Sequence, residues 1–222
     1  MSLWDSNDKY GFLTHINQSI GQINLNTKFG QLIKNYSENN NIKSILEIGT
    51  WNGLGSTRCI VEGLQNRANN DYVFYSLECN TEKSTFAKNL YKNLKNVNIL
   101  NEVLINSMPN NINEIFPEIL SNPNYKYWNT IDYENMKDKE LFLNKKSLPE
   151  FFDLILLDGG EFTTYFEYQL LKDKCKYLML DDINVPKCNL IVKEIENDSE
   201  KWEIIEKENE RNGFLICRNK YI

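Results

Sequence analysis

Short apolar runs alternate with segments of helical spacing from residue 44 onward. Five runs predict strands, at Ser44–Gly49, Tyr72–Leu77, Val97–Leu100, Phe151–Leu157 and Lys176–Leu180. The last two are almost continuously apolar, which is typical of parallel strands buried on both faces. The intervening periodicity predicts helices at Gly55–Gln65 and Thr81–Leu94, with Thr81 as the cap of the second. This alternation indicates a parallel sheet with helices on both faces.

The C-terminal segment has a different pattern. Trp202–Glu206 and Phe214–Cys217 flank a polar stretch that ends in Asn212-Gly213, which is a hairpin signal. In a nicotinamide-binding Rossmann domain the sixth strand instead continues parallel. We therefore predict a doubly wound, Rossmann-like α/β fold: a seven-stranded sheet of five parallel strands plus a C-terminal antiparallel hairpin, in a three-layer sandwich.

Two segments lie outside this framework. Residues 1–40 are expected to form an N-terminal helical or lid segment, with a helix from Thr27 to Tyr36, and residues 41–222 the Rossmann-like domain. That domain carries an insertion at about 102–150, and long connections of this kind are usually functional or disordered. The aromatic patch Tyr125-Lys-Tyr-Trp128 favours an ordered lid or substrate wall, although a partner-binding surface would have the same composition.

A glycine-rich turn joins the first predicted strand to its helix. It reads Glu47, Ile48, Gly49, Thr50, Trp51, Asn52, Gly53, Leu54, Gly55 and Ser56. Glycines permit positive φ, and the helix start offers unpaired N–H groups to a nucleotide-like ligand. The spacing does not suit a pyrophosphate, because Arg58 takes the third glycine position and no lysine comes after the turn. Glu47 favours a cationic cofactor over an anionic one. Trp51 lies either against the cofactor or in the packed interior.

The segment from Leu46 to Ser56 resembles the first motif of class I S-adenosylmethionine-dependent methyltransferases, in the form common among small-molecule O-methyltransferases. The resemblance covers about residue 27 to the C-terminus, apart from the insertion, and implies S-adenosylmethionine as the cofactor. By the same resemblance, Glu78 binds both ribose hydroxyls and Cys79 borders the adenine. Asp158 takes the place of an aspartate that faces the methyl group. Together with Glu47 and the turn residues Gly49 to Gly53, Gly55 and Ser56, these form the expected cofactor site.

Carboxylates after the last two parallel strands are the candidates for chemistry. We expect the general base among Asp158, Glu161 and Asp182, with Asp158 first, although Asp158 equally suits the cofactor's amine or a helix cap. Related metal-assisted enzymes carry an Asp-Asn pair after the fifth strand, and oxygen ligands suit magnesium or calcium. Here Ile183 separates Asp182 from Asn184, so a divalent metal is not favoured, and Asp181 and Asp182 are expected to end a strand and cap the next element.

Other aromatic and titratable residues have weaker signals. Another branch of the fold carries a histidine after the fourth strand, but Glu161 and Phe162 stand there instead. His15 is the sole histidine, and we expect it to be a surface or satisfied residue rather than catalytic. Tyr165 is a candidate wall of the acceptor pocket.

Composition limits the classes of molecule that this protein is expected to bind. The net charge of −6 argues against nucleic acid, which is bound largely through Lys and Arg. Five scattered cysteines indicate reduced thiols, and without a signal-like or membrane-spanning stretch we expect a cytoplasmic protein with no membrane partner. A small-molecule or saccharide acceptor fits best. The oligomeric state stays open, with a homodimer among the options.

The predicted function is S-adenosylmethionine-dependent O-methylation of a small molecule or sugar. An NAD(P)-dependent oxidoreductase is the leading alternative, and the glycine spacing and terminal hairpin disfavour it. A non-catalytic methyltransferase-fold interaction protein is the other alternative, and the joint presence of Glu47 and Glu78 disfavours it.

Overall fold

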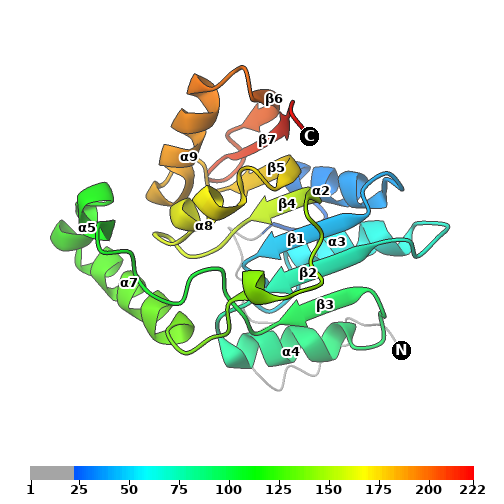
Figure 1. Ribbon diagram of the computed structural model, residues 1–222, viewed down its shortest axis with the longest axis horizontal. Helices are drawn as coiled ribbons and strands as arrows, with labels where there is room; N and C mark the ends of the chain where they lie inside the picture. The colour runs from blue at the N-terminus through cyan, green and yellow to red at the C-terminus, as the bar shows by residue number, and fades with distance from the viewer. Residues whose placement is uncertain (1–22) are drawn as a thin grey trace.

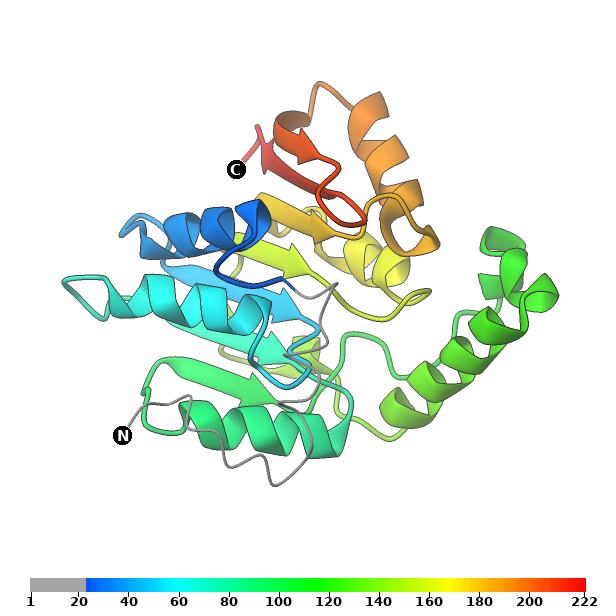
Figure 2. The same ribbon diagram turned by 180° about the vertical axis from the view of Figure 1, so that it is seen from behind.

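The computed structural model describes residues 23–222, which form one seven-stranded sheet between two layers of helices (Figures 1 and 2). The strand order is β3-β2-β1-β4-β5-β7-β6. The first five of these pair in parallel, and β7 runs antiparallel to both β5 and β6. The strands are β1 (Ser44–Ile48), β2 (Val73–Leu77), β3 (Val97–Leu100), β4 (Phe152–Leu157), β5 (Cys175–Asp181), β6 (Trp202–Glu208) and β7 (Phe214–Asn219). The predicted topology, including the terminal hairpin, is confirmed.

Helices α2, α3 and α4 cover one face of the sheet, and α8 and α9 cover the other (Figures 1 and 2). The helices are α2 (Lys28–Glu38), α3 (Ser56–Gln65), α4 (Thr81–Tyr91), α5 (Ile112–Ile115), α6 (Glu118–Ser121), α7 (Pro123–Met136), α8 (Thr164–Leu171) and α9 (Pro186–Asn197), with the 3₁₀ turn η1 (Phe142–Asn144). The cap predicted for α4 is wrong by one residue, because Asn80 Oδ1 accepts the Lys83 N–H at 3.0 Å.

Side-chain alternation along β1 divides the core between the two faces. Ile45 points into the layer of α2 and α3, whereas Leu46 and Ile48 point into the layer of α8 and α9. Helix α2 is part of the first layer, since Phe29 is buried and stacks on Phe214 with 4.5 Å between ring centroids. The division at residue 40 stays a prediction, and His15 lies outside the described residues.

The insertion leaves the sheet and returns to it at one point. Val103 forms an isolated parallel bridge with Leu141, and the Phe142 N–H donates to the Val103 carbonyl at 2.8 Å. Between these residues, α5, α6 and α7 form an arm beyond the carboxyl ends of the strands (Figure 1, green). Phe116 and Tyr125 each pack on Phe162 with centroids 5.4 Å apart, which holds the arm against the loop before α8. The insertion is therefore an ordered helical element over the edge where open α/β sheets bind ligands.

None of the helices in residues 23–222 has the length and apolar character needed to cross a bilayer.

Candidate functional site

The glycine-rich turn after β1 passes very close to the end of β4. Gly49 has φ 95°, and a Cβ there would lie 2.0 Å from the Asp158 carbonyl oxygen. Gly53 also has positive φ, 77°, and a Cβ there would lie 2.9 Å from the Ala87 Cβ on α4. Only glycine fits both positions without displacing backbone or core, so the turn is held between β4 and α4.

A cavity of about 340 Å³ opens at the carboxyl ends of the strands, between this turn and the arm. Most residues predicted to bind the cofactor lie in its wall: Gly49, Thr50, Trp51, Asn52, Gly55, Ser56, Glu78, Cys79 and Asp158. Asp182, a predicted base candidate, is also in the wall. Glu47, Gly53 and Glu161 are not among the residues that line the cavity.

Glu78, which comes directly after the last residue of β2, presents a preorganised carboxylate. Its Oε2 accepts the Trp51 N–H at 2.7 Å and its Oε1 accepts the Asn80 N–H at 2.8 Å. Burial raises the pKa of Glu78, and the two backbone hydrogen bonds together with the charge of Lys83 partly offset that rise. A carboxylate with both oxygens anchored still has lone pairs for a pair of vicinal hydroxyls.

Asn52 has a donor without a partner. Its side chain is buried, and its Oδ1 accepts the Leu54 N–H at 3.0 Å, which fixes the orientation of the amide. No hydrogen-bond partner for its Nδ2 exists among residues 23–222. A buried polar group left unpaired costs about 1–3 kcal/mol, so a ligand that accepts this hydrogen bond recovers that cost.

Backbone strain gathers around the cavity. Within the described residues, three positions other than glycine have positive φ: Trp51 (50°), Asp182 (56°) and Arg211 (57°), and all three line the cavity. Such conformations cost energy and cluster at ligand-binding sites. Trp51 is 37% exposed, with the Lys83 ammonium 4.6 Å from its ring centroid. It therefore belongs to the cavity rim and not to the packed interior.

Glu47, which the sequence predicted in the cofactor site, is not among the residues that line the cavity. Its carboxylate is fully buried and accepts hydrogen bonds from three hydroxyls: Ser56 Oγ at 2.6 Å, Thr57 Oγ1 at 2.7 Å and Ser76 Oγ at 2.5 Å. Burial raises the pKa of Glu47 to about 7 against the effect of these bonds. Its charge is directed at the scaffold between β1, β2 and α3. A contact between Glu47 and a cofactor stays a prediction. The preference for a cationic cofactor depends instead on the acidic side chains in the cavity wall.

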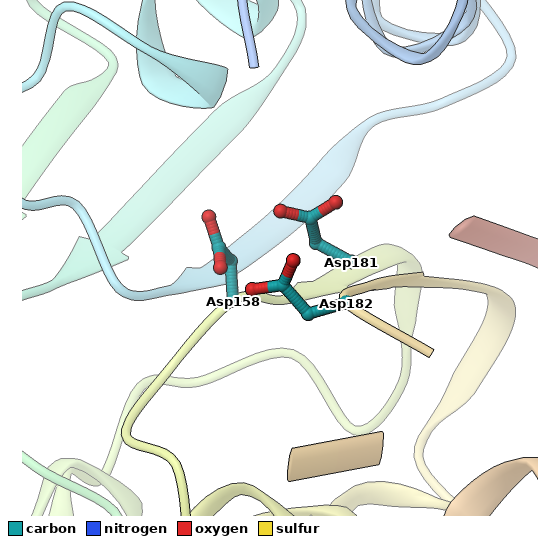
Figure 3. Close-up of side chains that lie close together, drawn as sticks. All are labelled: Asp158, Asp181 and Asp182. Carbon is teal, nitrogen blue, oxygen red and sulfur yellow. The ribbon is translucent and has the colours of Figure 1, made fainter. Parts of the chain in front are cut away.

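Three carboxylates converge where β4 and β5 end: Asp158, Asp181 and Asp182 (Figure 3). Their nearest oxygens lie within 4.8 Å of one another. The Lys187 Nζ lies 2.5 Å from Asp158 Oδ1 and 3.1 Å from Asp182 Oδ2. Arg211 Nη2 lies 3.1 Å from Asp181 Oδ2. Each acid of the cluster is thus already paired with a cation of the chain itself.

The pairing of these aspartates with cations decides whether a divalent metal fits the site. A divalent ion between Asp158 and Asp182 would have to displace the Lys187 ammonium, so the donor set as built does not fit a resident metal. Burial alone would lower the pKa of Lys187, but the charges of the two aspartates hold it well above its usual value. Lys187 is therefore a fixed cation. Sequence reasoning missed it, although Pro186 marks a helix start shortly after β5.

The predicted capping role of the aspartates is wrong. The N-cap position of α9 is Val185, and that of α8 is Thr163. Asp181 ends β5 as expected, while Asp182 Oδ1 accepts from Asn212 Nδ2 at 3.0 Å. Burial alone would raise the pKa of Asp182, but Lys187 and this hydrogen bond lower it.

The aromatic residues predicted as substrate walls do not line the cavity. Tyr125 and Trp128 pack against each other at 5.4 Å on the arm, and neither is a lining residue. The Tyr165 hydroxyl donates to Glu194 at 2.7 Å, also outside the wall. From α7 the wall receives Asp132 and Met136 instead.

Comparisons with known proteins place the fold. No protein-family profile matches the sequence, and no curated protein matches it either. Among solved structures, an O-methyltransferase from Bacillus cereus in complex with SAH superposes with a TM-score of 0.58 at 13% identity, over 97% of this chain and 91% of that one. A putative caffeoyl-CoA O-methyltransferase from Staphylococcus aureus superposes at 0.54 and 16% identity, over 97% and 100%.

A third similar structure is the O-methyltransferase TomG from Streptomyces achromogenes in complex with SAM, with a TM-score of 0.57 at 10% identity, over 93% and 86%. This chain has the class I methyltransferase fold. The predicted fold class is thereby confirmed, and two of these three structural neighbours are O-methyltransferases in complex with SAH or SAM.

Proposed function

We propose that the chain is an S-adenosylmethionine-dependent methyltransferase that methylates an oxygen of a small molecule or sugar. The observation that carries the proposal is the Glu78 carboxylate, which the Trp51 and Asn80 N–H groups hold in the wall of a cavity at the carboxyl edge of the sheet. A ribose with two free hydroxyls matches those anchored oxygens. The unpaired Nδ2 of Asn52, in the same wall, suits an acceptor oxygen of the cofactor.

Glu78 and Asn52 would hold S-adenosylmethionine, which would supply a methyl group on a sulfonium. Transfer of that group to the acceptor oxygen would leave the electron pair of the S–C bond on sulfur. The chain's task is to hold the acceptor oxygen close and aligned. We assign the oxygen's proton to the carboxylate of Asp158, with Asp182 as the second candidate. Glu161 lies outside the wall and is the weakest candidate of the predicted three.

Lys187 has a positioning role in this scheme. Its ammonium fixes one oxygen of Asp158 at 2.5 Å, which leaves the other oxygen to face the acceptor. Because its pKa is held high, Lys187 stays charged and cannot itself take the proton. Its positive charge also favours the developing negative charge on the acceptor oxygen.

The alternatives have less support. An oxidoreductase with a dinucleotide needs room for a pyrophosphate at the first turn, where Arg58 replaces the third glycine. A scaffold without catalysis has no use for a buried unpaired donor at Asn52 or for three strained residues around one cavity.

Calorimetry tests the proposal. Titration with S-adenosylmethionine and with S-adenosylhomocysteine should show binding to the wild-type protein, and Glu78→Ala should abolish it. Glu82→Ala is the matched control, since Glu82 is an exposed carboxylate in the first turn of α4. If neither ligand gives heat with the wild-type protein, the proposal is wrong.

A further inference from the structure

The cavity wall carries more negative than positive side chains. Seven acids line it (Glu78, Glu102, Asp132, Asp158, Glu167, Asp181 and Asp182), against three bases (Lys83, Lys187 and Arg211). Most of the acids have partners. Lys187 and Arg211 pair with the three aspartates after β4 and β5, Lys145 lies 2.7 Å from Glu102, and backbone N–H groups hold Glu78. Within residues 23–222, two acids of the wall, Asp132 and Glu167, have no ion pair within 4.0 Å and lack the two backbone N–H groups that hold Glu78. Asp132 accepts one backbone hydrogen bond, from Glu161.

Glu167 is the more unusual of the two. It is 6% exposed, and its Oε2 has no hydrogen-bond partner in the described part of the chain. Burial first, and then the charge of Asp132, raise the pKa of Glu167 to about 8, with Lys187 and the Thr164 hydroxyl acting in the opposite direction. A buried carboxyl oxygen without a hydrogen-bond partner is unfavourable unless a ligand supplies one.

The two acids come from different elements and both approach the loop that contains Gly159 and Gly160. Glu167 lies on α8 and Asp132 on α7 of the arm. A Cβ on Gly159 would lie 2.7 Å from Glu167 Oε2, and a Cβ on Gly160 would lie 2.6 Å from Asp132 Oδ2. The two adjacent glycines therefore leave the space that both carboxylates occupy. The arm brings one of these two carboxyl groups to the cavity.

We infer that Asp132 and Glu167 form a binding site for a positively charged group of the methyl acceptor, so that the substrate class is a small hydroxylated amine. The inference rests on the proposed function, and it narrows the acceptor from any small molecule or sugar to a cationic one. Two carboxylates bind an ammonium through charge-assisted hydrogen bonds, which are about twice as strong as neutral ones. A neutral or anionic analogue leaves the pair uncompensated.

The test compares ligands that differ only in charge, on protein saturated with S-adenosylhomocysteine. One series is glucosamine, glucose and glucuronate, and the other is tyramine, 4-ethylphenol and 4-hydroxyphenylacetate. In at least one series we expect the amine to bind about tenfold more tightly than its neutral analogue and the anion to bind least, by calorimetry. If neither series shows this order, the inference is wrong.

Two variants separate the site from its alternatives. Glu167→Gln keeps the shape and removes the charge, so it should abolish the preference for the amine without lowering the thermal midpoint. Glu134→Gln, an exposed carboxylate on the same helix as Asp132, should leave the preference unchanged. If Glu167→Gln instead weakens S-adenosylhomocysteine binding as strongly as amine binding, the pair serves the cofactor and the inference is overturned. If the wild-type protein binds neither S-adenosylmethionine nor S-adenosylhomocysteine, the proposed function itself is wrong.

Discussion

Lys187→Met is the substitution whose effect the structure predicts most directly. The Lys187 side chain is 6% exposed and its ammonium contacts Asp158 and Asp182, which are 24% and 19% exposed. Methionine keeps most of the length of the side chain and removes its charge, so the two largely buried carboxylates of Asp158 and Asp182 lose their counter-ion. Removing one partner of a buried ion pair costs about 3–5 kcal/mol, and Arg211 compensates only the neighbouring Asp181 fully. We therefore expect the free energy of unfolding to fall by about 3 kcal/mol.

The pH dependence gives this prediction its direction. Without the ammonium, the pKa of Asp158, which burial already raises, rises further, and the pKa of Asp182 loses the lowering effect of Lys187 and rises as well. The folded variant then binds more protons than the unfolded one, so its stability falls as pH rises through that range. The loss relative to wild type should be smaller at about pH 5 than at about pH 8.

Urea unfolding followed by tryptophan fluorescence measures both quantities. Lys207→Met is the control, because Lys207 and Glu196 form an ion pair at 2.6 Å with side chains 39% and 44% exposed. Exposed pairs contribute about 0–1 kcal/mol, so this variant should stay close to wild type at both pH values. A loss for Lys187→Met no larger than that of the control, or one that grows toward acid pH, would refute the reasoning.

Three further predictions concern the same site. Asn52→Ala should weaken S-adenosylhomocysteine binding about tenfold in calorimetry, because it removes the unpaired donor in the wall; unchanged affinity would contradict the role assigned to Nδ2. Glu167→Gln should stabilise the free protein in thermal unfolding, increasingly as pH rises from about 4.5 to about 8 and by a constant amount above that, because the raised pKa of Glu167 means that its charged form destabilises the fold; a gain that does not grow across this range would contradict this. The thermal midpoint should be the same in EDTA and in excess magnesium chloride, and a rise with magnesium would contradict the conclusion that the aspartate cluster does not hold a metal.

Local pattern was enough for most of the sheet. Buried parallel strands are continuous apolar runs, and the Asn212-Gly213 turn marks a hairpin by itself, with Gly213 at φ 83° in the structure. The glycine-rich turn and Glu78 were also found from sequence, because each is marked by its place at the end of a strand. Alternation along β1 places Glu47 on the same side of the sheet as Ile45, toward α3. The sequence therefore already contained the signal that Glu47 does not line the cofactor cavity.

The sequence alone therefore determined the order of strands and helices and one half of the cavity, since strand ends gather at one edge of a parallel sheet. Which side chains share the other half depended on tertiary structure. Lys187 at the start of α9, Glu167 on α8 and Asp132 on the arm are far apart in the chain, and none belongs to a local motif. Burial and pairing of charges act between elements in space, so only the packed fold decides that Lys187 compensates Asp158 while Asp132 and Glu167 stay without a counter-ion.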